Sequence, residues 1–167
     1  MEEQVHTEET GSVKRVSDFA GEATATVLGA GYCPVAPGTA GSMVASVLFF
    51  VLVPSVPLAW GLCGLFLILG YWGCSWGRRE WGKDPSRVVV DELAGCWIAM
   101  LALTDRGSLA GIAAAFVLFR LFDIFKPWPV SIFDRMDSAA GILLDDVAAG
   151  IMAALTLRAG LYLHGLL

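Results

Sequence analysis

Apolar residues fall into five stretches separated by polar or turn-forming segments: Ser42–Val53, Leu58–Trp76, Leu93–Leu103, Ser108–Phe125 and Val147–Leu163. A lone helix that crosses a bilayer needs about 20 apolar residues, and several of these stretches are shorter. The third stretch reaches that length only if it includes Val88–Val90 together with Asp91 and Glu92. The pattern predicts an all-α, single-domain helical membrane bundle with about five membrane-associated helices, some of them inserted partially or at a tilt.

The amino-terminal segment has a different pattern. Acidic residues outnumber basic ones there, which predicts a flexible acidic tail over residues 1–16 and a helical membrane domain over residues 17–167. Ser17–Leu28 mixes apolar and polar positions and precedes Gly29, which favours a short helix at the membrane surface. No basic start or cleavage site typical of a secretion signal is present, so we expect the apolar stretches to stay in the mature protein.

The composition supports membrane residence. Apolar residues make up 56% of the 167 residues and charged residues 16%, and the mean hydropathy is +0.67. Soluble domains have about 45–50% apolar and about 25% charged residues. Four basic residues lie within residues 78–87, and loops rich in Lys and Arg usually face the cytoplasm. Alternation from this loop predicts a polar site at the cytoplasmic ends of the helices, which holds residues 29–42 and 126–146.

The first polar motif is the Pro/Gly-rich segment Gly29–Ser42, which leads into an apolar helix. Backbone N–H groups at such a helix start can bind an anion, and hydroxyl groups can assist them. The candidate phosphate-binding residues are Pro37, Gly38, Thr39, Gly41 and Ser42. An ordinary turn in which Ser42 caps the helix is the alternative.

Asp91 and Glu92 are adjacent carboxylates at the start of the third apolar stretch. The positive end of a helix dipole favours negative charge there, so helix capping is one interpretation. Side chains one residue apart diverge by about 100° on a helix. We therefore expect only one of the two carboxylates to point fully into a shared site.

Arg120 and Asp123 lie three residues apart inside an apolar stretch, with Lys126 at its end. Their spacing places Arg120 and Asp123 on one helix face. Ionised residues inside a membrane cost roughly 2.5–3.5 kcal/mol each on insertion scales. Either a function or an ion pair must offset that cost. The alternative to a functional role is a structural ion pair between Arg120 and Asp123. In that case Lys126 only extends its side chain to the membrane surface.

A second pair of adjacent carboxylates, Asp145 and Asp146, lies at the entry to the last apolar stretch. Helix capping explains one of them but leaves the other without a role. The five carboxylates of these motifs, set against Arg120 and Lys126, leave a charge of −3 when all are ionised. A divalent cation would relieve this excess, and oxygen ligands without nearby His or Cys suit Mg²⁺ better than zinc. Metal, basic residues and an anion-binding turn together indicate phosphoryl chemistry.

These motifs, in this order, resemble the phosphatidylglycerophosphatase A family: A-P-G-T-x-G-S, D-E, F-R-x-F-D-x-x-K-P-x-P and L-D-D-x-x-A-G. The match runs from about Gly29 to Ala154. The resemblance implies Mg²⁺-dependent hydrolysis of phosphatidylglycerophosphate to phosphatidylglycerol and phosphate in phospholipid biosynthesis. It also implies an integral protein of the bacterial inner membrane whose active site faces the cytoplasm.

Under this hypothesis Asp91, Glu92 and Asp146 bind the metal, while Arg120, Asp123, Lys126 and Asp145 are the catalytic residues. Arg120 and Lys126 would stabilise charge on the phosphoryl oxygens. Asp123 would orient Arg120, or act as general base or nucleophile. Expected partners are the lipid substrate and membrane lipids, with no nucleic acid, and the oligomeric state stays open. The alternatives are another lipid phosphate as substrate, or a non-enzymatic transporter or assembly subunit, whose charges would spread through the membrane depth.

Overall fold

The computed structural model describes residues 16–52, 54–163 and 165. Within these residues all regular structure is helical, which confirms the all-α part of the predicted fold. A helical segment over residues 16–25 comes first. It is followed by η1 (Ala30–Tyr32), α2 (Pro37–Leu52), α3 (Val56–Trp81), α4 (Val90–Met100), α5 (Leu109–Phe125), α6 (Val130–Asp134) and α7 (Ala139–Leu163). The predicted acidic tail lies outside the described residues, except for residue 16, which is helical.

Four helices begin earlier than the apolar stretches that predicted them, and the shift is largest for α2 and α7. α2 begins at Pro37, whose fixed φ suits the first position of a helix, and not at Ser42. α7 begins at Ala139, where the Ser138 hydroxyl accepts a hydrogen bond from the Gly141 N–H (3.0 Å), and not near Val147. The anion-binding turn expected before α2 is therefore the start of α2 itself. The paired aspartates lie inside α7 and not at its entry.

The predicted surface helix ends sooner than expected. Its helical segment stops at residue 25, and Val27 and Leu28 have positive φ angles of 49° and 54°. The Thr26 hydroxyl donates to the Glu22 carbonyl (2.8 Å) and accepts from the Gly29 N–H (3.0 Å). These bonds turn the chain toward η1 before Gly29 is reached.

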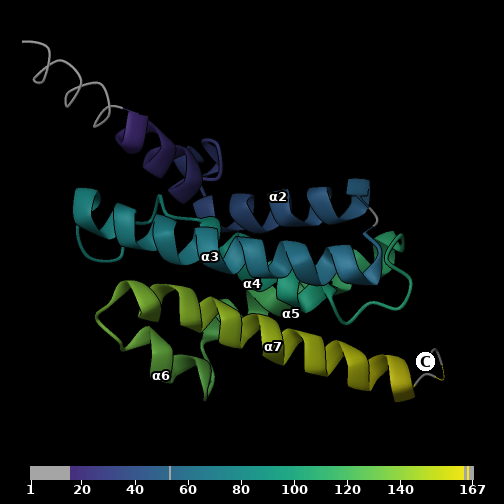
Figure 1. Cartoon of the computed structure of the whole chain (residues 1–167). Helices are drawn as coiled ribbons and strands as arrows, with labels where there is room; N and C mark the ends of the chain where they lie inside the picture. The colour runs from purple at the N-terminus through teal and green to yellow at the C-terminus, as the bar shows by residue number, and fades with distance from the viewer. Residues whose placement is uncertain (1–15, 53, 164, 166–167) are drawn as a thin grey trace, which may run out of the picture.

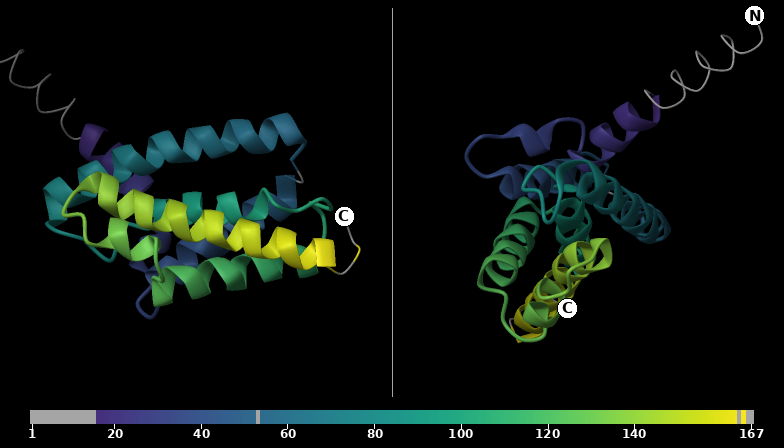
Figure 2. Two further views of the ribbon diagram at one scale, coloured as in Figure 1. Left: turned by 90° about the horizontal axis from the view of Figure 1, so that it is seen from below. Right: turned by 90° about the vertical axis from the view of Figure 1, so that its left-hand side faces the viewer.

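The long helices run alternately up and down, with α4 in the middle of the bundle (Figures 1 and 2). α4 packs against α2, α3, α5 and α7, and all of its residues except Glu92 and Ile98 are buried. α2, α4 and α7 begin at the end of the bundle where α3 and α5 finish. This end is called the site end below, because every polar motif of the sequence lies there.

Trp97 anchors α4 in the core. Its side chain is fully buried, and its indole N–H donates to the Ala59 carbonyl of α3 (3.0 Å). Phe49 of α2 and Phe66 of α3 contact its ring edge-on, with centroids 4.9 and 5.0 Å away. Such aromatic pairs add stability beyond the area that they bury. They hold α4 between α2 and α3.

Two glycines bring α4 and α7 into backbone contact. A Cβ atom on Gly150 would lie 2.3 Å from the Gly95 carbonyl oxygen, and one on Gly95 would lie 2.6 Å from the Asp146 carbonyl oxygen. Only glycine permits this approach, because real Cβ atoms do not come so near to backbone atoms. The crossing places Asp146 beside the first turns of α4.

We expect Gly150→Ala to destabilise the protein by about 1–3 kcal/mol, as overpacking of a close-packed interior does. The atoms that the new methyl group meets belong to the backbone of Gly95, which cannot rotate away. The apparent thermal midpoint in detergent measures this loss. Gly160→Ala on the same helix is the matched control, since a Cβ there meets nothing within 4 Å. Equal midpoints for the two variants would contradict the close contact.

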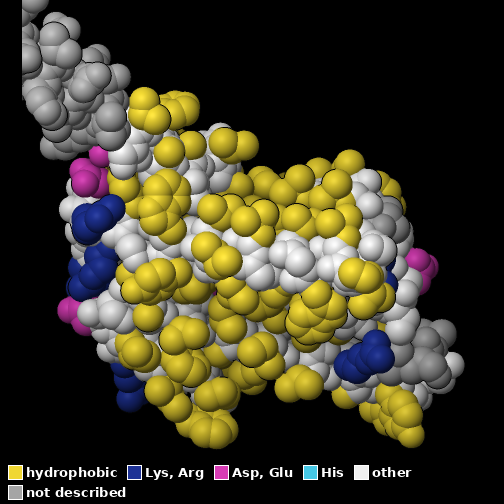
Figure 3. Space-filling view, viewed as in Figure 1, with side chains coloured by type: hydrophobic (Ala, Val, Ile, Leu, Met, Phe, Trp, Pro, Cys, Tyr) yellow, Lys and Arg dark blue, Asp and Glu magenta, His cyan; other side chains and the backbone are white. Residues whose placement is uncertain are grey.

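Two helices are long and apolar enough to cross a membrane: α3, with a mean hydropathy of 1.6, and α7, with 1.7. α4 has 11 residues and extends roughly 16 Å, about half of a bilayer core. Length and composition thus single out fewer candidate spans than the five membrane-associated helices that the sequence predicts. Figure 3 shows hydrophobic side chains along the long side of the bundle and charged ones gathered at its ends.

Candidate active site

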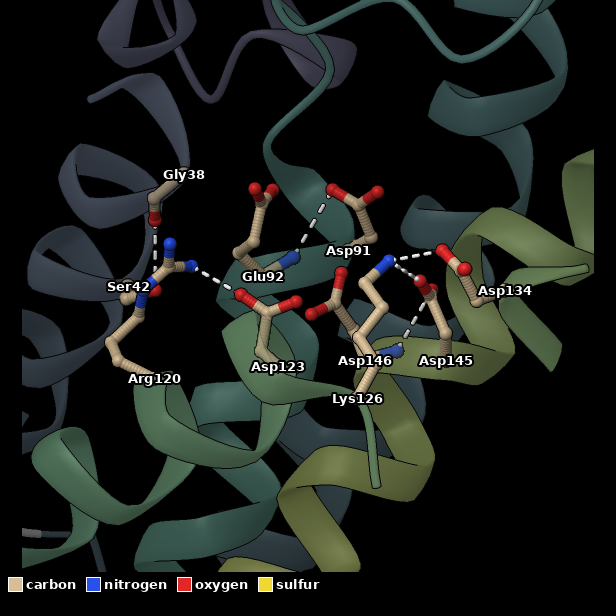
Figure 4. Close-up of polar contacts among 10 residues, drawn as sticks. All are labelled: Gly38, Ser42, Asp91, Glu92, Arg120, Asp123, Lys126, Asp134, Asp145 and Asp146. Carbon is tan, nitrogen blue, oxygen red and sulfur yellow. Dashed lines mark hydrogen bonds and ion pairs between the residues drawn. The ribbon is translucent and has the colours of Figure 1, made fainter. Parts of the chain in front are cut away.

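Three carboxylates from two helices converge at the site end. Asp91 and Glu92 occupy the first turn of α4, and Asp146 comes from α7. Their oxygen atoms lie within 4.8 Å of one another, and Figure 4 shows the three side chains facing a common space. The expectation that only one of Asp91 and Glu92 would enter a shared site is corrected here. The longer Glu92 side chain spans the angle between neighbouring helical positions.

In this three-carboxylate cluster Asp91 and Asp146 are buried, Glu92 is half-buried, and two of the buried oxygen atoms are unbonded. Glu92 Oε2 and Asp146 Oδ1 have no hydrogen-bond partner among the described residues. Burial raises the pKa of Asp91 to about 6 and the pKa of Glu92 well above its usual range. Close, buried carboxylates with free oxygens are costly unless a cation joins them. The all-oxygen donor set fits Mg²⁺, whose ligands lie at about 2.1 Å.

Arg120 and Asp123 form an ion pair on α5, with Nη1 and Oδ2 2.6 Å apart. The structure thus contains the pair that the sequence offered as the alternative to a functional role. The Arg120 Nε has no hydrogen-bond partner in the described part of the chain. A guanidinium has five N–H donors, so pairing with one carboxylate leaves donors for another anion.

The start of α2 lies against Glu92 and Arg120. A Cβ atom on Gly38 would lie 2.2 Å from Glu92 Oε1 and 3.2 Å from Arg120 Nη1. The first N–H groups of a helix have no partner within it. The N–H groups of Gly38 and Thr39 precede that of Ala40, which bonds to the Ala36 carbonyl (3.1 Å). Pro37 has no N–H, so Gly38 and Thr39 are the two backbone donors at this point.

Gly41 and Ser42, two of the predicted phosphate-binding residues, make contacts within the protein. A Cβ atom on Gly41 would lie 2.7 Å from the Val89 carbonyl oxygen. The fully buried Ser42 hydroxyl donates to the Gly38 carbonyl (2.8 Å), so its proton is engaged within α2. Both residues bring α2 close to α4, which sets Gly38 beside Glu92.

Lys126 lies on the other side of the cluster, opposite Arg120 (Figure 4). Its Nζ is 2.7 Å from Asp145 Oδ2 and also pairs with Asp134 of α6. Burial lowers the pKa of Lys126, but its bonds to Asp134 and Asp145 outweigh that effect and raise the pKa overall. Asp145 therefore faces Lys126, while Asp146 joins Asp91 and Glu92. No sequence signal indicated Asp134, because α6 lies in a segment expected to be a loop.

A second group that sequence reasoning missed lies at the rim of the site. Asp137 pairs with Arg78 at the end of α3 and with Lys83, whose Nζ is 3.0 Å from Asp137 Oδ2. Hydrogen bonds from Lys83 and Arg78 lower the pKa of Asp137. The three residues line a small polar pocket of about 60 Å³, together with Asp134 and Asp145. The basic loop that predicted the topology thus also contacts the site.

Comparison with known proteins identifies the family of the chain. The family model described as phosphatidylglycerophosphatase A matches residues 23–161, which include every predicted site residue. A phosphatidylglycerophosphatase A of Escherichia coli is 37% identical over 132 residues, which cover 75% of this chain and 74% of the relative. One of Haemophilus influenzae is 36% identical over 135 residues, which cover 78% and 82%.

A protein of Bacteroides thetaiotaomicron, named provisionally a phosphatidylinositol-3-phosphatase, is 39% identical over 147 residues, or 84% of this chain and 92% of the relative. No solved structure matches the chain. The family model covers well over half of the sequence, and its match includes the carboxylate cluster, Arg120 and the start of α2. The chain therefore belongs to the phosphatidylglycerophosphatase A family.

Proposed function

We propose that the protein is a Mg²⁺-dependent phosphatidylglycerophosphatase, which hydrolyses phosphatidylglycerophosphate to phosphatidylglycerol and phosphate. The observation that carries the proposal is the convergence of three carboxylates, two of them buried and one half-buried, beside Arg120 and the start of α2. This arrangement offers a cation site next to donors for a phosphate. The Escherichia coli and Haemophilus influenzae relatives bear the name of this activity.

Asp91, Glu92 and Asp146 would hold the metal, since they are the site carboxylates that have no basic partner among the described residues. Bound Mg²⁺ supplies Lewis-acid polarisation of a phosphate oxygen and lowers the pKa of a coordinated water. The protein holds the carboxylate oxygens of Asp91, Glu92 and Asp146 in position. α4 and α7 are held together at Gly95 and Gly150, so the carboxylates from the two helices stay close.

Arg120 and the N–H groups of Gly38 and Thr39 would bind the phosphoryl oxygens. Charge-assisted donors that are already in place stabilise developing negative charge without reorganisation. Asp123 would orient Arg120 through their ion pair. We favour this orienting role for Asp123 over a role as general base or nucleophile. Of the five predicted phosphate-binding residues we retain Gly38 and Thr39 for direct contact.

Lys126 and Asp145 would act as a pair on the other side of the cluster. Asp134 and Asp145 fix the Lys126 ammonium group, which adds positive charge opposite Arg120. The Asp146 N–H donates to Asp145 Oδ1 (3.0 Å), so the pair is tied to the backbone of the cluster. A phosphate between Arg120 and Lys126 would have a cation on each side.

We propose an integral protein of the bacterial inner membrane with the site end facing the cytoplasm. α3 and α7 would cross the bilayer, and the shorter helices would be membrane-associated parts of one domain over residues 17–167, after an acidic tail. Arg78 and Arg79 in the last turn of α3, together with Lys83, support this orientation through the positive-inside tendency. Lys and Arg side chains gather at this end of the bundle in Figure 3.

A second candidate substrate is another lipid phosphate, and the provisional name of the Bacteroides thetaiotaomicron relative favours phosphatidylinositol 3-phosphate. The transporter or assembly-subunit alternative predicts charges spread through the membrane depth. The ion pairs of Arg120, Lys126 and Asp137 instead lie together at the site end. Their position favours an enzyme that acts at the membrane surface.

The proposal is tested with purified protein in mixed micelles of phosphatidylglycerophosphate, phosphatidylinositol 3-phosphate or phosphatidic acid, with Mg²⁺ present. We expect phosphate release from phosphatidylglycerophosphate to exceed release from the other two lipids by about tenfold, the factor that about 1.4 kcal/mol of selectivity provides. Asp146→Asn, purified identically, controls for contaminating phosphatases. Fastest release from phosphatidylinositol 3-phosphate would assign the second substrate, and release from none would contradict a lipid phosphatase.

A further inference from the structure

An apolar groove of about 300 Å³ lies between α2 and α5. It is lined by Met43, Val47 and Phe50 of α2 and by Leu109, Ala113 and Phe116 of α5. Met43, Val47, Phe50 and Leu109 are exposed large apolar residues, so the groove opens at the surface of the bundle. No residue of the proposed catalytic machinery lies within it.

Helical spacing connects this groove to the proposed phosphate site. Arg120 follows Phe116 by four positions on α5, and residues four apart lie on the same side of a helix. Thr39 precedes Met43 by four positions on α2 in the same way. α2 and α5 run antiparallel, and Gly38 lies beside Arg120 at the site end. The groove therefore continues along both helices toward the residues that would bind phosphate.

The length of the groove fits one leaflet of a bilayer. Arg120 lies 11 positions after Leu109 on α5, which corresponds to roughly 16 Å along the helix axis. A hydrocarbon core is about 30 Å thick, so one leaflet takes about half of it. A lipid acyl chain whose headgroup lies at Arg120 and which follows the groove would end near the bilayer midplane.

A larger apolar groove of about 470 Å³ lies between α3 and α7. Leu143 of α7 packs against Gly70 of α3 at its site end, where a Cβ atom on Gly70 would lie 2.8 Å from Leu143 Cδ1. The lining of the larger groove comes from α3, α4, the residues that follow α4, and α7, and none of it comes from α2 or α5. Of the two grooves, the one between α2 and α5 is thus lined by the helices that carry Gly38, Thr39 and Arg120.

We propose that the groove between α2 and α5 binds an acyl chain of the lipid substrate while the phosphate lies at Arg120 and the start of α2. This inference rests on the proposed function, because it takes a lipid phosphate as the substrate. The occupant is defined by the continuity of an apolar groove with an anion site, since only an amphiphile with a phosphate headgroup fills both. A long chain contacts the whole length of the groove, whereas a short chain ends before it, so the groove distinguishes long chains from short ones.

The test is Ala113→Trp, which fills the groove from α5 at an exposed position. Dioleoyl and dibutyroyl phosphatidylglycerophosphate are compared at fixed detergent concentration. Ala113 lies about 10 Å along α5 from Arg120, so four-carbon chains end before it. We expect the KM for the dioleoyl ester to rise by about tenfold, which corresponds to about 1.4 kcal/mol of lost binding, with kcat/KM for the dibutyroyl ester unchanged. Val47→Trp fills the same groove from α2 and should act alike.

Ala110→Trp is the matched control, because Ala110 is an exposed alanine of α5 outside the groove lining. Ala154→Trp fills the larger groove and should leave both esters unaffected. The inference is overturned if Ala113→Trp and Val47→Trp leave the dioleoyl KM unchanged or reduce turnover of both esters equally. A selective dioleoyl effect in Ala154→Trp alone also overturns it. Wild-type protein that hydrolysed neither ester would contradict the proposed function itself.

Discussion

Replacing Asp146 with asparagine is expected to lower phosphate release by about 10²–10³-fold or more, the range seen when one charge-stabilising group is removed from an active site. Asparagine keeps the size of the side chain but removes one of three converging negative charges. The Asp146 backbone packs against Gly95, so the change leaves the helix crossing intact. The measurement is the initial rate in mixed micelles, with helix content followed by circular dichroism.

Asp105→Asn is the matched control for this variant. Asp105 is exposed at the opposite end of the bundle, where its Oδ1 accepts the Gly107 N–H (3.1 Å). Asparagine can accept the same hydrogen bond, so we expect wild-type turnover. Near-normal turnover in Asp146→Asn would remove Asp146 from the site, and equal losses in both variants would indicate a general effect of lost charge.

The positions of the helices were largely predictable, because a helix that contacts the core or the membrane along its length has a continuous run of apolar residues. Their starts were not, as α7 shows. The helical turn of α7 that precedes Val147 contains Asp145 and Asp146, and these two charged residues lower the local hydropathy. The apolar pattern therefore begins later than the helix does. α6 has 5 residues, too few for any periodic pattern to reveal it. Tertiary packing on α7 supports it instead.

The charge excess of the site was predictable as a sum but not as a set of pairs. The sequence places Lys126 near Asp123, yet the structure pairs it with Asp134 and Asp145. Arg120 pairs with Asp123 and Lys126 pairs with Asp145, so the −3 of the five predicted carboxylates falls on Asp91, Glu92 and Asp146. Asp134, which the sequence did not indicate, adds a further negative charge beside Lys126. Pairings between distant segments depend on how α5, α6 and α7 pack, which spacing along the chain does not encode.

Glycines near a phosphate motif have two interpretations that sequence alone does not separate. Gly38 leaves room beside Glu92 and Arg120 at the site, whereas Gly41 leaves room for the Val89 carbonyl in the contact with α4. Both uses need the absence of a Cβ atom, so both produce the same residue in the motif. The three-dimensional neighbours decide which use applies.

Removing divalent cations is expected to abolish phosphate release, and adding Mg²⁺ back is expected to restore it. The reason lies in the carboxylate cluster: Asp91, Glu92 and Asp146 bring three oxygens together with no basic side chain paired to them among the described residues. Without a cation their mutual repulsion and burial oppose the closed arrangement. EDTA treatment followed by Mg²⁺ titration, with initial rates at each step, measures the effect.

A binding measurement separates the metal site from catalysis. Mg²⁺ at 100 times its Kd should stabilise the folded protein by about 2.7 kcal/mol, and the thermal midpoint in detergent should rise with Mg²⁺ concentration. Asp146→Asn should lose most of this rise, because it removes one ligand charge. Asp105→Asn should keep it. Full turnover in EDTA, or a Mg²⁺-induced rise that Asp146→Asn leaves unchanged, would contradict a metal bound by these three carboxylates.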